Sequence, residues 1–283
     1  MPASDDNEPQ VKRLLIYPVK GCAGQPCESV EVQARGLAWD RRWMLVDGEG
    51  RFLSQRQLPA LALIQARVVG EELVLSHPGF DAQAVLPTTP PSSAPRVRVT
   101  IWRDECEAVR LPDAGRWASE VLGRRCELVF MPADVRRPVN PAFASSPGQI
   151  VGFADAFPIL LVGEASLADL NTRLDVPVPV ERFRPNLIVS TPVAFAEDGW
   201  GELEVGSARL CGVKASDRCT VTTVDQRTGE PRGPEPIRTL AGYRRFGGGK
   251  VFFGQNLTVH RPGQIHVGDR VHVLGQIPSV YGP

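Results

Sequence analysis

Cysteine and histidine are scarce in this chain, and their spacing excludes several common kinds of site. Among 283 residues there are six cysteines and four histidines. No two cysteines form a C-x-x-C pair, which excludes a zinc ribbon and a thioredoxin-type motif, and the histidines include no H-E-x-x-H. Six cysteines are too few for a disulfide framework in a chain of this length, so we expect a reducing compartment.

Long apolar runs and an excess of charge are also lacking. The longest apolar run, FPILLV at 157–162, is too short to span a bilayer. The first ten residues, MPASDDNEPQ, are acidic and polar, unlike a secretory or mitochondrial targeting segment. The formal net charge is zero, which argues against a surface devoted to nucleic acid. We therefore expect a cytoplasmic protein with neither a membrane nor a nucleic acid as its partner.

Hydrophobic residues make up 42% of the sequence, which is enough to fill a core. They occur mostly in short apolar or alternating runs separated by glycine and proline, a pattern typical of strands. Turn residues predict hairpins at 70–71, 103–104 and 205–206, whereas helical spacing is limited to 113–123 and 164–174. The predicted fold is mainly β with a few helices, and an antiparallel barrel or sandwich is favoured over a doubly wound sheet.

A long proline-rich segment divides the chain. Residues 132–149 are irregular in sequence, and loops of this length are uncommon inside compact domains, so we interpret the segment as a linker or a lid. It separates a predicted first domain, residues 11–131, from a second, residues 150–276. In the first domain, Asp113 is the expected N-cap of the helix and Gly123 its end.

The segment KASDRCTVTTVDQRTGE at 214–230 places a cysteine at the start of a predicted strand. Lys214 and Arg218 precede Cys219 and favour its thiolate form, which is both a nucleophile and a metal ligand. A charged sulfur suits a soft or high-valent metal better than magnesium or calcium. Taken alone, however, the segment is more typical of an ordinary half-buried strand cysteine.

Basic residues recur at predicted strand ends and starts, beside turn residues. Lys20 ends one strand, Arg41 and Arg42 begin another, and the segment RFRPN at 182–186 precedes a third. Each is an ordinary solvated charge when considered singly. Together they predict a site for a phosphate-bearing cofactor, because guanidinium groups bind phosphate with two hydrogen bonds at once.

Several motifs together resemble one family, the MOSC proteins. They are YPVKGCAG, GLAWDRRWMLVD, SLADLN, RFRPN, DRCTVTTVDQRTGE, EPIRTLAGYR, FFGQNL and GQIHVGDRVHVL, in family order from Val11 to Leu274. The sequence is most similar to the branch that contains the mitochondrial amidoxime-reducing component and the bacterial YcbX-type proteins. This resemblance implies a smaller N-terminal MOSC β-barrel domain followed by a β-barrel MOSC domain, with a cofactor between them.

The resemblance also implies the cofactor and the residues that hold it. The cofactor is molybdenum carried by molybdopterin, a pterin dithiolene with a phosphate, and Cys219 matches the cysteine that binds the metal. The other matching positions are Lys20 and Arg41 from the first domain, Arg184, Asn186, Asp217, Arg218 and Asn256 from the second, and Asp155 and Ala156, which approach the cofactor mainly through backbone.

This chain departs from the family pattern at three points. Asp217 stands where serine is common, which brings a carboxylate close to an anionic cofactor and makes it a candidate proton donor by proximity alone. Gly21 stands where some relatives have serine, so a hydroxyl contact is lost. The C-x4-C-x2-C pattern of an iron–sulfur domain is absent, so electrons are expected from a separate flavin or iron–sulfur reductase.

The resemblance implies reduction of a small N-hydroxylated substrate, such as an amidoxime, at the cysteine-bound molybdenum. Two alternatives stay open. In the first, Cys219 carries a persulfide and passes sulfur to a metal–sulfur centre. In the second, the protein is a non-enzymatic carrier of the molybdenum cofactor.

Overall fold

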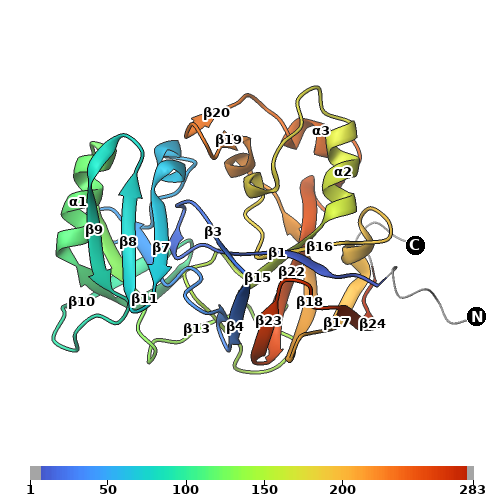
Figure 1. Cartoon of the computed structure of the whole chain (residues 1–283), viewed down its shortest axis with the longest axis horizontal. Helices are drawn as coiled ribbons and strands as arrows, with labels where there is room; N and C mark the ends of the chain where they lie inside the picture. The colour runs from blue at the N-terminus through green and yellow to red at the C-terminus, as the bar shows by residue number, and fades with distance from the viewer. Residues whose placement is uncertain (1–7, 279–283) are drawn as a thin grey trace, which may run out of the picture.

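Two groups of strands lie side by side in the computed structural model, which describes residues 8–278 (Figure 1). The first group comes mainly from residues 43–130 and the second mainly from residues 150–276. Residues 1–7, which hold most of the acidic N-terminal segment discussed above, lie outside the described residues. The predicted class, mainly β with a few helices, is confirmed by the element order. The strands form open sheets and short ladders as follows.

The largest sheet has nine strands and comes mostly from the second half of the chain. In spatial order its strands are β24 (Val271–Gln276), β17 (Trp200–Val205), β18 (Ala208–Asp217), β22 (Lys250–Arg261), β15 (Ile159–Gly163), β16 (Leu187–Val189), β1 (Val11–Ile16) and β3 (Gln25–Cys27), with β21 (Arg245–Phe246) paired to β22. The first strand of the chain therefore pairs with β16, far along the sequence.

The other sheets are shorter. A five-stranded sheet runs β10 (Arg96–Ile101), β11 (Asp104–Leu111), β12 (Glu127–Phe130), β6 (Trp43–Val46), β2 (Val19–Lys20). Two three-stranded sheets are β23 (Gly263–His266), β4 (Ser29–Gln33), β5 (Gly36–Leu37), and β7 (Gln65–Val69), β8 (Glu72–His77), β9 (Phe80–Pro87). Two-stranded ladders join β13 (Arg137–Pro138) to β14 (Ile150–Val151) and β19 (Val224–Asp225) to β20 (Glu230–Pro231).

Helices are few and short. The α-helices are α1 (Pro112–Leu122), α2 (Glu164–Thr172) and α3 (Ile237–Ala241), and the 3₁₀ turns are η2 (Pro59–Leu63), η3 (Val180–Arg182), η4 (Ala196–Gly199) and η5 (Thr220–Thr223). Gly123 ends α1 in the left-handed conformation, as predicted, because glycine adopts φ +59° without a steric penalty. Asp113 is not the N-cap: that position is Leu111, and Asp113 lies in the first turn, where its charge favours the helix dipole.

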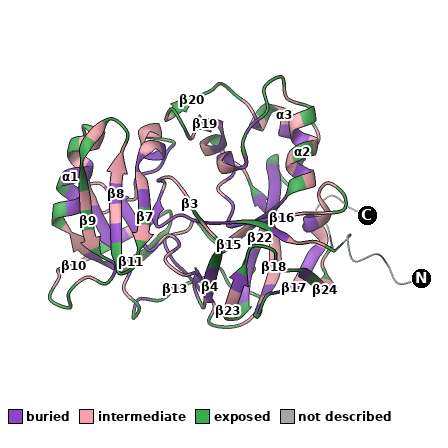
Figure 2. Cartoon of the chain, viewed as in Figure 1, coloured by how far each residue is buried: buried purple, intermediate pink, exposed green. Residues whose placement is uncertain are grey.

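Separate apolar cores support the two groups of strands, and the buried positions follow their central strands (Figure 2). One core packs β1, β4 and β5 against strands of the second half, including Val11 and Leu14 beside Leu203 and Leu257. Another packs β6, β8 and α1 around the fully buried Trp43. The early strands thus carry the chain from one core into the other.

One hairpin turn was placed correctly and two were displaced by one residue. Val69 pairs with Glu72, so the first turn is residues 70–71, as the sequence predicts. Val205 pairs with Ala208, so the second turn is residues 206–207 rather than 205–206. In the third, Ile101 pairs with Asp104, so the turn is residues 102–103 rather than 103–104. This displacement places an aromatic residue in the turn itself.

The predicted strand after Cys219 is wrong for its first half. Residues 220–223 form the 3₁₀ turn η5, and only Val224 and Asp225 are extended. Thr222 Oγ1 donates to the Cys219 carbonyl and Thr223 Oγ1 donates to that of Thr220. Threonine hydroxyls that bond to the preceding turn compete with a strand ladder, and here they outweigh the β-branched propensity.

Candidate functional site

A cavity of about 830 Å³ brings together residues from both groups of strands. All eleven site residues predicted from the sequence are among those that line it. They are Lys20, Gly21, Arg41, Asp155, Ala156, Arg184, Asn186, Asp217, Arg218, Cys219 and Asn256. Lys20 ends β2, Asn256 lies in β22, and Arg218 and Cys219 follow the end of β18.

The lining of this cavity is strongly basic. Eight lysine and arginine residues contribute to it, against the two carboxylates of Asp155 and Asp217. The whole chain has a formal net charge of zero, so the positive charge is gathered at this one place. A concave site with an excess of cations raises the local concentration of anions. The cavity therefore suits a ligand with several negative charges.

Backbone strain is concentrated in the same cavity. Of the five described non-glycine residues with positive φ, three line it: Arg41 at +47°, Trp102 at +58° and Arg184 at +57°. Each such residue costs on the order of 1–3 kcal/mol and persists only when its surroundings hold it in place. Strain of this kind is typical of functional sites rather than of packing.

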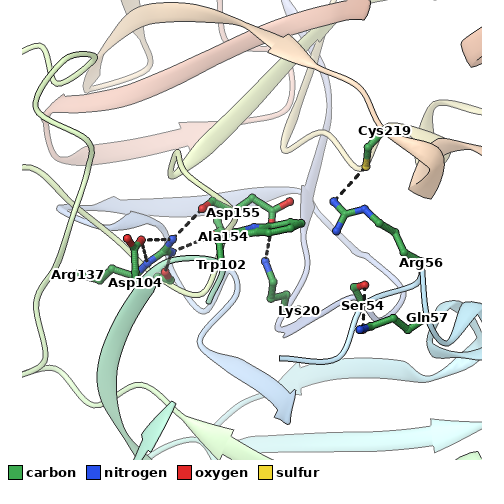
Figure 3. A network of polar contacts seen from close by, with 11 residues as sticks. Lys20, Ser54, Arg56, Gln57, Trp102, Asp104, Arg137, Ala154, Asp155 and Cys219 are labelled. Atoms are coloured by element: carbon green, nitrogen blue, oxygen red, sulfur yellow. Dashed lines mark hydrogen bonds and ion pairs between the residues drawn. The ribbon is translucent and has the colours of Figure 1, made fainter. Parts of the chain in front are cut away.

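Lys20 and Asp155 form an ion pair across the cavity. Lys20 Nζ lies 2.5 Å from Asp155 Oδ1, which also accepts a hydrogen bond from Trp102 Nε1 at 3.0 Å (Figure 3). Burial lowers the pKa of Lys20 below its ordinary value. Burial by itself would raise the pKa of Asp155. The contacts with Lys20 and Trp102 outweigh this effect and lower the pKa of Asp155 below its ordinary value.

Arg41, Arg184 and Asn186 lie around Tyr17. Both guanidinium carbons lie 4.3 Å from the centre of the Tyr17 ring. Burial raises the pKa of Tyr17 to about 12 and lowers that of Arg184 to about 10. Arg41 donates to Asp40 at 2.6 Å and to Asn186 Oδ1 at 3.0 Å.

Asn186 is almost fully buried, and its side chain connects three segments. Its Nδ2 donates to the Leu15 carbonyl and to Asp40 Oδ1, while its Oδ1 accepts from Arg41 and from the Leu160 backbone. These four hydrogen bonds occupy both the donor and the acceptor of the Asn186 amide. Asn186 therefore holds Arg41 in position in addition to lining the cavity.

Cys219 is half-buried in the cavity wall. Arg56 Nη2 donates to its Sγ at 3.3 Å, reaching across from the first group of strands (Figure 3). Arg218, the residue directly before Cys219, is held in place by hydrogen bonds that it donates to Ser216 Oγ and to the Phe183 carbonyl. No other cysteine is among the residues that line the described cavity.

Asp217 is flanked by two lysines. Lys214 Nζ and Lys250 Nζ lie 2.8 Å and 2.6 Å from its carboxylate oxygens. Burial favours the protonated form, but the two lysines outweigh it and lower the pKa of Asp217. They also neutralise the negative charge that Asp217 brings close to an anionic ligand. A carboxylate held ionised in this way is a poor proton donor.

Several residues of the site were not found by sequence reasoning. Arg56 and Trp102 line the cavity, but each lies in a turn without a distinctive motif. Arg137 does not line it, yet it donates to the carbonyls of Gly152, Ala154 and Asp155 and so holds the loop that carries Asp155 (Figure 3). The only signal for Arg137 was its place in the long segment 132–149.

Two features are absent from the part of the chain that the structure describes. Between residues 8 and 278, no group of three or more His, Cys, Asp or Glu side chains could hold a metal ion. Within the same range, no helix is both long and apolar enough to cross a membrane.

Comparison with known proteins identifies the class and then the family. Residues 8–125 match the MOSC N-terminal beta barrel domain, and residues 148–272 match the MOSC domain. Mitochondrial amidoxime-reducing component 1 of Mus musculus is 36% identical over 283 residues, covering 94% of this chain and 82% of that protein. The Homo sapiens component 1 is 36% identical over 281 residues, covering 94% and 83%.

Component 2 of Homo sapiens is 33% identical over 277 residues, covering 93% of this chain and 82% of that protein. Among solved structures, the YUAD protein of Bacillus subtilis is 14% identical, covers 93% of each chain and has a TM-score of 0.42. The chain belongs to the family of MOSC proteins that includes the mitochondrial amidoxime-reducing components. The family resemblance read from the sequence motifs is thus confirmed.

Proposed function

We propose that this protein reduces N-hydroxylated compounds, such as amidoximes, with a molybdenum cofactor bound in the cavity. The observation that carries the proposal is a single thiol, Cys219, in the wall of a cavity with eight basic residues. The substrate class comes from the relatives, which are named amidoxime-reducing components.

The residues present fit this cofactor chemically. A pterin dithiolene with a phosphate carries several negative charges, and the lining supplies an excess of positive ones. A thiolate suits a soft or high-valent metal, so Cys219 is the proposed metal ligand. The residues proposed to hold the rest of the cofactor are Lys20, Gly21, Arg41, Asp155, Ala156, Arg184, Asn186, Asp217, Arg218 and Asn256.

When bound, the cofactor supplies the two-electron chemistry. The reaction breaks the N–O bond of the substrate, consumes two electrons and two protons, and releases the oxygen as water. The basic residues of this chain bind and orient the anionic group, and Lys20 keeps Asp155 ionised beside it. Asp217, paired with two lysines, is better suited to holding Lys214 and Lys250 in position than to giving up a proton.

Other parts of the proposal concern organisation and partners. We place the domain boundary in residues 132–149, between domains 11–131 and 150–276, with the early strands crossing between them. Electrons come from a separate flavin or iron–sulfur reductase, and this chain carries no iron–sulfur cluster of its own, which iron and sulfide analysis tests. The cytoplasmic location stays a proposal, since the relatives are named mitochondrial; cell fractionation tests it.

Molybdenum and pterin content per chain test the proposal directly. Wild-type protein, Cys219→Ala and Cys211→Ala are produced in a cofactor-sufficient host and purified without oxygen. Cys211, on β18, is the matched control because it is half-buried like Cys219 but does not line the cavity. We expect about one molybdenum per chain in wild type and Cys211→Ala, none in Cys219→Ala, and turnover of an amidoxime only with the metal.

Each alternative predicts a different result. Cyanide-releasable sulfur on Cys219 without molybdenum would instead favour a persulfide carrier. Molybdenum and pterin that pass to a partner protein, with no turnover under reducing conditions, would favour a cofactor carrier. Normal molybdenum content in Cys219→Ala would refute the metal-ligand assignment.

A further inference from the structure

Trp102 is a large aromatic side chain left exposed at the wall of the cavity. It lies in the turn between β10 and β11, and 48% of its surface is accessible. Its backbone has φ +58°, which costs a bulky residue on the order of 1–3 kcal/mol. A tryptophan that is half exposed and has a strained backbone does not stabilise an apolar core, so packing does not explain why a tryptophan lies here.

Three contacts hold the indole in place. Its Nε1 donates to Asp155 Oδ1 at 3.0 Å, and its ring centre lies 5.0 Å from that of Phe52. The guanidinium carbon of Arg56 lies over the ring, 4.5 Å from its centre. The indole is therefore oriented by the same carboxylate that binds Lys20, inside the proposed site (Figure 3).

Arg56 connects this ring to the thiol. While its carbon lies over Trp102, its Nη2 lies 3.3 Å from Cys219 Sγ. Arg56 is itself exposed and makes no ion pair with a carboxylate among the described residues, so a substrate that enters has to displace its contacts with Trp102 and Cys219. The planar guanidinium of Arg56 thus lies against the Trp102 indole, with one of its nitrogens beside the Cys219 sulfur.

The core of an amidoxime has the same shape as this guanidinium. Both consist of one planar carbon bonded to nitrogens, and an amidoxime carries its N–OH group at the edge of that plane. Planar groups stack well on an indole face, whereas a tetrahedral nitrogen holds its substituents out of the plane and stacks poorly.

We propose that the planar core of the substrate stacks on Trp102, in the slot that Arg56 occupies in this structure. This inference rests on the proposed reductase function and specifies its substrate class: N-hydroxylated compounds whose nitrogen belongs to a planar, conjugated group. Trp102 is then the specificity-determining residue. Arg56 is a gate that leaves the indole when substrate enters.

Binding in the absence of any electron donor tests the slot, because the enzyme then cannot turn over. Equilibrium dialysis with the molybdenum-loaded protein compares benzamidoxime, which is planar and uncharged at pH 7.5, with 1-hydroxypiperidine, whose nitrogen is tetrahedral. Trp102→Ala is expected to weaken benzamidoxime binding about tenfold and 1-hydroxypiperidine binding less than twofold. Trp102→Phe restores most of the benzamidoxime affinity.

Arg56→Ala vacates the slot and is expected to tighten benzamidoxime binding about threefold. Val69→Ala is the control, since Val69 is an exposed apolar residue that does not line the cavity. The Val69→Ala protein should bind benzamidoxime with the same affinity as wild type. Benzamidoxime affinity unchanged in Trp102→Ala, or reduced equally for both ligands, would overturn the inference. Weaker binding in Arg56→Ala would overturn the gate.

The two proposals fail in distinguishable ways. If the loaded protein does not reduce amidoximes but the binding pattern holds, the reductase proposal fails and the stacking site stands. If amidoximes are reduced while Trp102→Ala binds them normally, the stacking site fails and the reductase proposal stands. Molybdenum content is measured in every variant, so that loss of the cofactor is not mistaken for loss of the slot.

Discussion

Arg137 is expected to hold the Asp155 loop, and replacing it by methionine tests that role. The side chain is 2% exposed and comes from the segment that the sequence marked as a linker or lid. Its Nη1 donates to the carbonyls of Gly152 and Ala154, and its Nη2 donates to that of Asp155. Its Nε and Nη2 also bind Asp104, beside the turn that carries the cavity tryptophan.

The expected cost follows from these bonds. Methionine replaces the aliphatic part of the arginine but has no donor. The three carbonyls therefore lose charge-assisted bonds, and the buried carbonyls find no replacement partner. Bonds to a charged group contribute about 1.5–3 kcal/mol each, and they are not additive. Counting only the better-buried Gly152 and Ala154, we expect Arg137→Met to lower the free energy of unfolding by about 3–5 kcal/mol.

Urea unfolding followed by far-ultraviolet circular dichroism measures this change. Arg136→Met is the matched control, because the neighbouring Arg136 is exposed and, among residues 8–278, donates only to the Gly148 carbonyl. It should change the free energy of unfolding by less than about 0.5 kcal/mol. A loss below about 1 kcal/mol in Arg137→Met would refute the claim that this arginine holds the loop.

Two further predictions concern charges in the cavity. Because Lys20 lowers the pKa of Asp155 in the folded state, their pairing contributes stability above pH 4 that is lost as the pH falls further. Asp155→Asn should therefore be less stable than wild type at pH 7, and the gap in urea midpoint should shrink at pH 3; a constant gap would contradict the pairing. Arg184→Ala should lower molybdenum content more than melting temperature, whereas Arg182→Ala, buried outside the cavity lining, should lower melting temperature and leave the content of the folded protein unchanged. Equal molybdenum content in the two variants would count against Arg184 as a cofactor contact.

Local sequence patterns predicted much of the fold. Alternating and apolar runs marked the strands, and paired turn residues located one hairpin turn correctly and two others to within one residue. These signals are local, because side-chain period and turn chemistry depend on residues a few positions apart. The failures were local too: threonine hydroxyls formed the turn η5 where β-branched residues predicted a strand.

Pairings between distant segments were beyond the reach of such patterns. Nothing in the run VKRLLI indicates that β1 pairs with β16, which begins at Leu187. Likewise, the proline-rich composition of 132–149 indicates a loop but not that it delivers a buried arginine to the carbonyls of 152–155. Partners of this kind depend on which surfaces meet when the whole chain packs.

The sequence by itself determined the class of fold, the family and the eleven residues now found in one cavity, because the family motifs carry those residues in a recognisable order. Tertiary structure alone decided what surrounds them. It placed Arg56 from one group of strands against Cys219 from the other, turned Trp102 into the cavity wall, and brought Lys250 to Asp217. These contacts join residues far apart in the chain or exposed in turns, where spacing along the sequence carries no information about distance in space.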